Sequence, residues 1–257
     1  MISNMISIKS EYEISLMKKA GNIVYNTIKL VGENIKPGVT TYELNRIAED
    51  YIRNEGAIPS CLGYQGYPAS ICTSVNEEVV HGIPSKKRKL KEGDIIDIDV
   101  VACYKGYHAD ACKTFAVGKI SQEKQYLLEH TEKALYVGLE QVKPGNRVGD
   151  IGYAIESYAR KHKLGVVREL VGHGIGSSMH ENPDIPNYGE KGTGPVLKEG
   201  MCIAVEPMLN LGTAQVFILD NDWTIVTGDG KPSAHFEHSV VVTIDGYEIL
   251  TGDDNNE

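Results

Sequence analysis

The sequence lacks most features that would place a chain outside the ordinary globular class. Only five of its 257 residues are cysteines (61, 72, 103, 112 and 202), and no two of them form a C-x-x-C pair. A disulfide framework is therefore not expected, and a reducing cytoplasm is the predicted location. No apolar run approaches the roughly 18 residues that span a bilayer. The chain does not open with a basic segment followed by an apolar core, so neither a membrane contact nor a signal peptide is expected.

Positive charge is also in deficit. Lysine and arginine total 26 against 35 aspartates and glutamates, which gives a net charge of −9. Nonspecific nucleic-acid binding is therefore not expected to be the main task, and no specific DNA binding is predicted. The basic run KKRKLK at 86–91 is interpreted as a solvated loop, with an RNA or ribosome contact as the alternative.

The common short catalytic motifs are missing as well. The sequence contains no H-E-x-x-H, no G-x-S-x-G and no G-x-x-x-x-G-K-[ST], which removes the local signals of zincins, α/β-hydrolases and P-loop enzymes. A Cys-His nucleophile pair has no local signature here, although such a pair could also be assembled by the fold.

An internal repeat organises the chain. Lys-Pro-Gly recurs at 36–38 and 143–145, and LKEGDIIDID, from Leu90, recurs as LKEGMCIAVE, from Leu197. Both matches have an offset of 107 residues. This self-similarity predicts a single catalytic domain, residues 1–257, made of two similar halves at about 1–119 and 120–257. Helices are expected at 42–54 and 149–162, each followed by β structure, in an α+β fold with helices on one face of a sheet.

The stretch IIDIDVVACYKGYHADACKTF, residues 95–115, reads as a β-hairpin with acids in its walls. A two-residue turn at Lys105-Gly106 would place Val101 opposite Asp110. Asp99 would then be a diagonal neighbour of Asp110 on the same face, with the Cα atoms roughly 7–8 Å apart. Two carboxylates that converge require that one be protonated or that a cation lie between them.

A third acid, Asp97, lies one pleat away on the same face. We interpret it as a residue that either supports a ligand from outside or faces solvent. A three-residue turn would instead put the other two acids on opposite faces, so the interpretation depends on the turn.

The second half supplies further candidates. Glu206 follows Asp99 by the repeat offset of 107, GHGIGSSMHENP carries His173 and His180, and SAHFEHSVVV carries Glu237. Carboxylates combined with one imidazole suit Co²⁺, Mn²⁺, Fe²⁺ or Zn²⁺. Four carboxylates match the charge of two divalent metal ions, an arrangement that aminopeptidases and phosphatases use.

Six blocks of the sequence, in order and spacing, resemble the type I methionine aminopeptidases. They are CLGYQGYPASICTSVNEEVVHGIP, GDIIDIDV, GYHADACKTF, GHGIGSSMHENP, AVEPM and SAHFEHSVVVT. The resemblance covers nearly the whole chain and implies the pseudo-two-fold "pita-bread" α+β fold. It also implies removal of the N-terminal methionine from nascent polypeptides when the second residue is small.

The same resemblance assigns roles to individual residues. Two divalent ions, bridged by water or hydroxide, would be bound by Asp99, Asp110, His173, Glu206 and Glu237. Glu206 would act as general base, while His81 and His180 would contact substrate and stabilise the tetrahedral intermediate. The methionine pocket would be lined by Cys61, Tyr64, Tyr67, Cys72, Trp223 and Met179, the last standing where the family often has an aromatic residue.

Two other functions fit the same blocks. An Xaa-Pro aminopeptidase would share the fold and the ligand set, but such chains usually carry an additional N-terminal domain. A non-catalytic peptide-binding module would typically have lost metal ligands, whereas all five positions are filled here.

Overall fold

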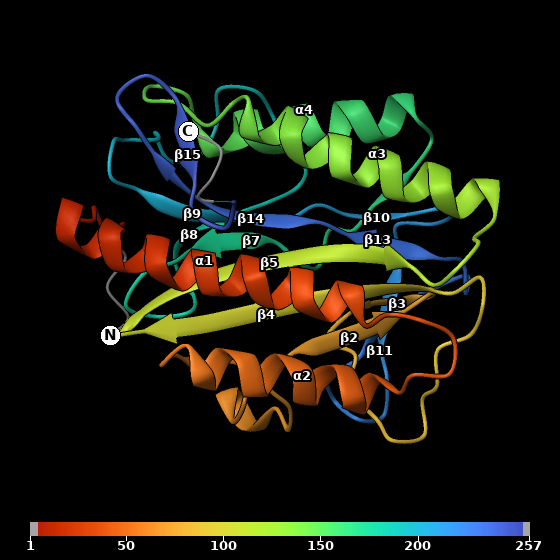
Figure 1. Cartoon of the computed structure of the whole chain (residues 1–257). Coiled ribbons are helices and arrows are strands. Elements are labelled where there is room, and N and C mark those ends of the chain that lie inside the picture. Colours follow the sequence, from red (N-terminus) through yellow and green to blue (C-terminus); the bar gives the residue numbers. More distant parts are fainter. Residues whose placement is uncertain (1–4, 254–257) are drawn as a thin grey trace.

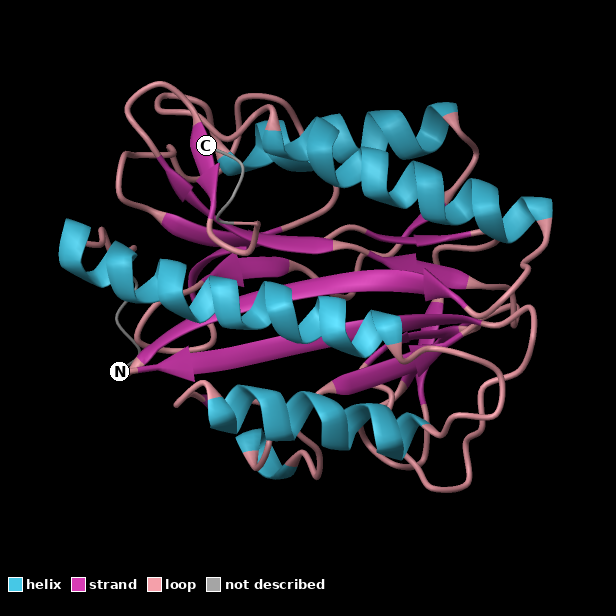
Figure 2. Ribbon diagram, in the orientation of Figure 1, coloured by secondary structure: helices cyan, strands magenta, loops and turns pink. Residues whose placement is uncertain are grey.

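Four long helices flank a curled antiparallel sheet in the computed structural model, which describes residues 5–253 (Figures 1 and 2). Within these residues the helices are α1 (Glu11–Glu33), α2 (Thr41–Asn54), α3 (Gln122–Leu139) and α4 (Val148–Lys161), with a short 3-10 helix, η1 (Tyr64–Gly66). No helix in this part of the chain is long and apolar enough to cross a bilayer.

Local sequence signals set where the first two helices begin. Ser10 and Glu13 form a reciprocal capping box at the start of α1, and Thr40 and Glu43 form another at the start of α2. Such boxes satisfy backbone N–H groups that have no partner within the helix. The predicted helices at 42–54 and 149–162 agree with α2 and α4 to within one residue at each end.

A nine-stranded sheet runs in the order β1-β4-β5-β14-β9-β7-β8, with β15 paired to β14 and β2 paired to β4. Its strands are β1 (Ile58–Pro59), β2 (Cys72–Val75), β4 (Ile95–Tyr104), β5 (Tyr107–Ala116), β7 (Gly172–Gly174), β8 (Glu181–Ile185), β9 (Cys202–Val205), β14 (Glu237–Val242) and β15 (Tyr247–Ile249). Together with the helices, this sheet confirms the predicted α+β class.

Two three-stranded sheets complete the β structure of the described residues. One contains β6 (Gly165–Val166), β10 (Met208–Asn210) and β13 (Ser233–His235). The other contains β3 (Glu78–Val80), β11 (Val216–Ile218) and β12 (Ile225–Thr227).

The repeat recurs in the structure. Helices α2 and α4 both have 14 residues, and their first residues lie 107 positions apart. Two isolated β-bridges, Thr40–Lys89 and Arg147–Val196, are separated by the same offset of 107. Corresponding segments of the two halves therefore adopt the same local structure.

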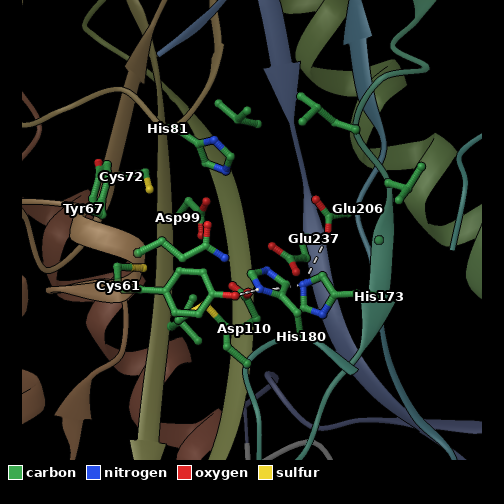
Figure 3. Close-up of a pocket in the computed structure, with 18 of the residues that line it drawn as sticks. Cys61, Tyr67, Cys72, His81, Asp99, Asp110, His173, His180, Glu206 and Glu237 are labelled. Carbon is green, nitrogen blue, oxygen red and sulfur yellow. Dashed lines mark hydrogen bonds and ion pairs between the residues drawn. The ribbon is translucent and has the colours of Figure 1, made fainter. Parts of the chain in front are cut away.

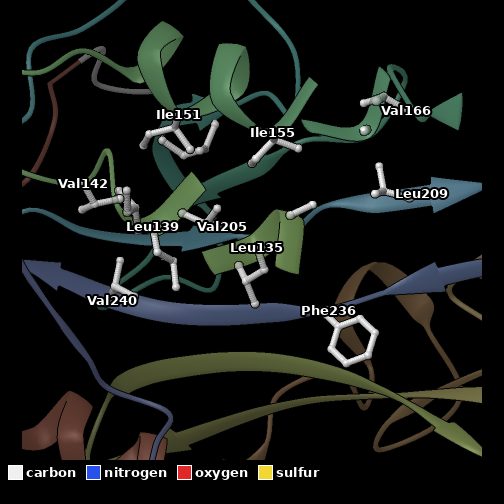
Figure 4. Packing of buried hydrophobic residues seen from close by; sticks show 14 of the residues in the cluster. Leu135, Leu139, Val142, Ile151, Ile155, Val166, Val205, Leu209, Phe236 and Val240 are labelled. Carbon is white, nitrogen blue, oxygen red and sulfur yellow. The ribbon is translucent and has the colours of Figure 1, made fainter. Parts of the chain in front are cut away.

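Buried apolar side chains lie between the helices and the sheet. In the second half, Leu135 and Leu139 of α3 and Ile155 of α4 pack with Val205 and Val240 of the sheet (Figure 4). The two helices approach closely at Gly138, where an added Cβ would lie 2.7 Å from the Ile155 side chain. This packing fixes the sheet from behind and leaves its opposite face for the site.

The β4–β5 hairpin has the predicted register. Its turn residues Lys105 and Gly106 have φ values of 49° and 88°, so both are left-handed, as a two-residue type I′ turn requires. Val101 pairs with Asp110, and Tyr104 pairs with Tyr107. The prediction that Asp99 and Asp110 share one face of the sheet is therefore confirmed.

Candidate metal centre

One cavity of about 520 Å³ is lined by every residue to which the resemblance assigns a role (Figure 3). Its acidic and imidazole wall consists of Asp99, Asp110, His173, Glu206 and Glu237. The rest of the lining includes His81, His180, Cys61, Tyr64, Tyr67, Cys72, Met179 and Trp223. The fold thus brings together residues from five strands and several loops.

Strand pairing places three acids on one face. Asp99 lies opposite Cys112, and Cys112 lies opposite Glu237 on the next strand. Asp110 is two residues from Cys112 and therefore points to the same side. Glu206 directly follows β9, which pairs with β14. Four adjacent strands, β4, β5, β14 and β9, consequently bring the four carboxylates to one point.

His173 reaches this point through a local irregularity. The β7–β8 register shifts between His173 and Gly174, and such a bulge re-aims side chains. A Cβ added at Gly172 would lie 2.3 Å from the carbonyl oxygen of Ala204, and one added at Gly174 would lie 2.2 Å from that of Asn182. The two glycines therefore allow the backbones to pack closely here.

The hydrogen bond of His173 defines its tautomer. Nδ1 lies 2.9 Å from the carbonyl oxygen of Gly174, which can only accept, so Nδ1 carries the proton. Nε2 therefore holds a lone pair. It lies 3.8 Å from Asp110 Oδ2 and 3.6 Å from Glu206 Oε1.

The electrostatics of the cluster favour a cation. Burial raises the pKa of Asp99 to about 7. Burial and the neighbouring carboxylates raise the pKa of Asp110 and of Glu237 well above the usual range. Buried Asp110 Oδ1 and Glu237 Oε1 have no hydrogen-bond partner among the described residues. Such groups are costly unless a partner compensates them.

The donor set fits a divalent metal. Asp110, His173 and Glu237 each offer one ligand atom, and these atoms lie within 4.8 Å of one another. Asp99 and Glu206 border the same cavity. A cation between these groups would stabilise their ionised forms and supply the missing partners.

These shifts predict a pH dependence for metal-free protein. The pKa of Asp99 is about 7 in the folded protein, against 3.8 for an aspartate in the unfolded chain. Between these pH values the folded form therefore binds more protons than the unfolded form. The free energy of unfolding should therefore fall as pH rises through this range. Because bound metal removes the penalty, Mn²⁺ should raise Tm more at about pH 7.5 than at about pH 5.5. An equal rise at both values, measured by thermal melting with and without Mn²⁺, would contradict this account.

An apolar pocket adjoins the acids. Cys61, Tyr67, Cys72 and Met179 belong to one hydrophobic cluster, against which Trp223 packs. The rings of Tyr67 and Trp223 meet edge to face at 5.0 Å. The Tyr67 hydroxyl donates to the Gly82 carbonyl oxygen at 3.0 Å, so the polar end of this side chain is satisfied.

Two histidines lie beside the acids. His180 Nδ1 is 2.7 Å from the Tyr64 hydroxyl, and its ring centroid is 4.3 Å from that of His173. His81 has a φ of 58°, a conformation that is uncommon for residues other than glycine and concentrates at functional sites. Burial lowers the pKa of His81 to about 4 and also lowers the pKa of His180. Both rings are therefore neutral near pH 7.

The structure decides between the two interpretations of Asp97 and places a further residue, His235, beside the carboxylates. Asp97 is 2% exposed, and its Oδ1 lies 2.6 Å from Thr114 Oγ1. The solvent-facing alternative for Asp97 is therefore wrong. His235, to which the sequence blocks assign no role, is buried with its Nε2 3.7 Å from Glu206 Oε2. Its position two residues before Glu237 was the available signal.

Comparisons with known proteins agree with this site. The sequence model of metallopeptidase family M24 matches residues 15–244. A methionine aminopeptidase of Clostridium acetobutylicum is 51% identical over 96% of this chain and 99% of its own. Methionine aminopeptidase 1 of Bacillus subtilis is also 51% identical, with the same coverage of both chains.

Solved structures extend the likeness to the fold. The methionine aminopeptidase of Rickettsia prowazekii superposes with a TM-score of 0.95 at 44% identity, covering 96% of this chain and 100% of that one. The X-Pro aminopeptidase of Thermotoga maritima reaches 0.73 at 25% identity, and the match covers 96% of this chain and 62% of that protein. The predicted pita-bread fold is confirmed, and the Xaa-Pro alternative is the weaker match. The chain therefore belongs to metallopeptidase family M24, among its methionine aminopeptidases.

Proposed function

We propose that the protein removes the N-terminal methionine from nascent polypeptides and peptides whose second residue is small. Two divalent metal ions, drawn from Co²⁺, Mn²⁺, Fe²⁺ and Zn²⁺, would be held by Asp99, Asp110, His173, Glu206 and Glu237. The observation that carries the proposal is one cavity in which four carboxylates and an imidazole adjoin an apolar pocket.

The methionine side chain would enter the apolar pocket. An unbranched thioether fits irregular apolar space and makes favourable contacts between sulfur and aromatic rings. Cys61, Cys72 and Met179 supply soft apolar surface, while Tyr67 and Trp223 supply ring edges. Binding there would bring the first peptide bond beside the carboxylates and leave the free α-amine close to Asp99, which would restrict cleavage to the first residue.

The remaining groups would serve the hydrolysis. Bound divalent ions supply polarisation of the scissile carbonyl and a nucleophile from water at neutral pH. Glu206, whose side chain is 13% exposed at the cavity wall, would take the proton of the attacking water and deliver it to the leaving amine. The Tyr64 hydroxyl can donate to His180 Nδ1, which leaves the ring proton on Nε2. His180 Nε2 and the neutral ring of His81 could then donate to the developing oxyanion.

The setting of the enzyme is part of the proposal. We infer a cytoplasmic location, supported by five unpaired cysteines. We also infer a single catalytic domain with two similar halves at about 1–119 and 120–257, supported by the matched helices α2 and α4. We also propose a ribosome contact through residues 86–91, where the basic side chains of Lys86, Lys87 and Lys89 are exposed.

Substrate preference tests the proposal. Met-Ala-Ser should be cleaved efficiently, because alanine adds little bulk beside the crowded carboxylates. Met-Ile-Ser should be cleaved at least roughly 100-fold less efficiently in kcat/KM, because a β-branched side chain is stiff at χ1 and cannot swing clear. Free methionine is measured by mass spectrometry over a peptide series that varies only the second residue.

The controls separate the rival functions. An Ala-Pro-Ser peptide should release little alanine, whereas preferred cleavage of this peptide would establish an Xaa-Pro aminopeptidase. Peptide binding without any product would favour the non-catalytic module. Equal cleavage of Met-Ala-Ser and Met-Ile-Ser would show that the filter on the second residue is absent.

A further inference from the structure

Lys9 is a buried lysine just before α1, outside the residues 15–244 that the family model matches. Its side chain is 3% exposed, and its Nζ lies 2.7 Å from Glu181 Oε2, whose side chain is 14% exposed. Lysine is seldom buried unless it is paired. The pair joins residues that are 172 positions apart in the chain.

Glu181 directly follows His180 and closes the loop that carries His180 and Met179. Residues 175–180 of this loop have neither helical nor strand structure. Glu181 Oε1 accepts the backbone N–H of Ser178 at 3.1 Å and lies 3.4 Å from Ser177 Oγ. The Glu181 carboxylate therefore holds both ends of the segment that contains Met179 and His180.

Lys9 connects this carboxylate to the rest of the protein. The other hydrogen bonds to the Glu181 carboxylate within residues 5–253 come from Ser177 and Ser178, which belong to the same loop. The Lys9 backbone is fixed separately, since its N–H donates to the Gly200 carbonyl at 2.8 Å. Gly200 lies in the turn that leads into β9 and hence to Glu206.

The loop backbone packs closely against the pair at Gly176. An added Cβ at Gly176 would lie 2.5 Å from Lys9 Cε and 2.6 Å from Glu181 Oε1, so the loop backbone contacts both side chains. Burial opposes ionisation of Glu181. Lys9 and the Ser178 N–H outweigh it and hold the pKa of Glu181 below its usual value. The contact is therefore a true ion pair near neutral pH.

We propose that Lys9 is a positioning residue that acts through Glu181 to fix the loop presenting His180 to the substrate carbonyl. This inference rests on the proposed function, because it assigns a partner to one of its histidines. His180 is held on its other side by the Tyr64 hydroxyl at 2.7 Å. Without Lys9, the backbone of His180 would move while its Nδ1 stayed hydrogen-bonded to Tyr64. Nε2 would then no longer point at the substrate carbonyl. Sub-ångström misplacement of such groups is costly to catalysis.

The test is a double-mutant cycle between Lys9→Met and His180→Ala, with methionine released from Met-Ala-Ser as the readout. Lys9→Met alone should lower kcat by about tenfold while KM changes by less than about twofold, because the lost contact acts on the transition state. In the His180→Ala background, Lys9→Met should change kcat by less than about twofold, because the group it positions is gone. Both variants should retain the metal content of the wild-type protein.

A matched control is available on α1. Lys18 pairs with Glu248 at 2.6 Å, but these side chains are 46% and 48% exposed. Exposed pairs contribute little, so Lys18→Met should leave kcat and KM unchanged.

Removing one partner of a buried pair destabilises a protein, so Lys9→Met could fail to fold. The double variant Lys9→Met/Glu181→Gln removes both charges and keeps an amide oxygen for the Ser178 N–H. It should fold and show the same roughly tenfold loss in kcat.

Three results would overturn the proposal. One is a wild-type kcat in both Lys9→Met and the Lys9→Met/Glu181→Gln variant. Another is a loss of the same size whether His180 is present or not, which would mark a merely structural role. Full activity of His180→Ala would also overturn it, because Lys9 is proposed to act through His180. Methionine release by the wild-type protein separates the two proposals, since its absence would overturn the proposed function as well.

Discussion

Asp110→Asn should nearly abolish methionine release, with a loss well above the roughly 10–100-fold that is typical of groups supporting a metal ligand from outside. Asp110 is 5% exposed, and its Oδ2 lies 3.8 Å from His173 Nε2. It also belongs to the group of three residues whose donor atoms lie within 4.8 Å. Asparagine keeps the shape but removes the negative charge that a cation requires. Kinetics and elemental analysis of the same preparation should show that activity and bound metal fall together.

Asp97→Asn is the matched control on the neighbouring strand. Asp97 is also buried, but its Oδ1 accepts from Thr114 Oγ1 at 2.6 Å, and Asp97 is not among the residues that line the cavity. This variant should keep its metal and lose no more than roughly 10–100-fold in kcat/KM. If Asp97→Asn lost the metal and Asp110→Asn kept it, the assignment of the two aspartates would be reversed.

Removal of all divalent metal should abolish activity, and Mn²⁺ or Co²⁺ should restore it. The metal-binding wall of the cavity consists of four carboxylates and the imidazole of His173. Without metal, burial holds the pKa values of Asp110, Glu206 and Glu237 well above their usual range, so these groups lack the charge that the reaction needs. Protein dialysed against a chelator is assayed before and after the addition of each ion.

The control for this experiment is dialysis against chelator already saturated with Mn²⁺, which should leave activity intact. Full activity of a protein verified as metal-free by elemental analysis would contradict the account. Loss of activity that metal does not restore, while the fold is retained by circular dichroism, would also contradict it.

The β-hairpin was predictable because local chemistry determines it. A type I′ turn, one of the two turn types common in two-residue hairpins, needs two left-handed residues, and Lys105-Gly106 supplies them with φ values of 49° and 88°. The turn fixes the register, and the register fixes which acids share a face. The helices at 42–54 and 149–162 were predictable for a similar reason, since their start signals are local: Thr40 caps α2, and the Arg147 N–H donates to Asp150 at the start of α4.

Other parts of the site depend on contacts that no local pattern encodes. The bulge at His173 depends on how the glycines beside it pack against Ala204 and Asn182. The approach of His235 to Glu206, and of Lys9 to Glu181, joins segments from different elements. Asp97 alternates along its strand as an exposed residue would, yet tertiary packing buries it beside Thr114. Such outcomes follow from the assembled fold, so the sequence could only nominate candidates.

The central claim is that the five residues of the cavity wall hold two divalent cations next to the methionine pocket. The most direct test is anomalous X-ray scattering from crystals of the protein grown with Mn²⁺. We predict two anomalous peaks, both inside the cavity and both contacted by Asp110 or Glu206, with Asp99, His173 and Glu237 completing the set. A cavity that holds no peak, or peaks bound only outside these five residues, would contradict the account.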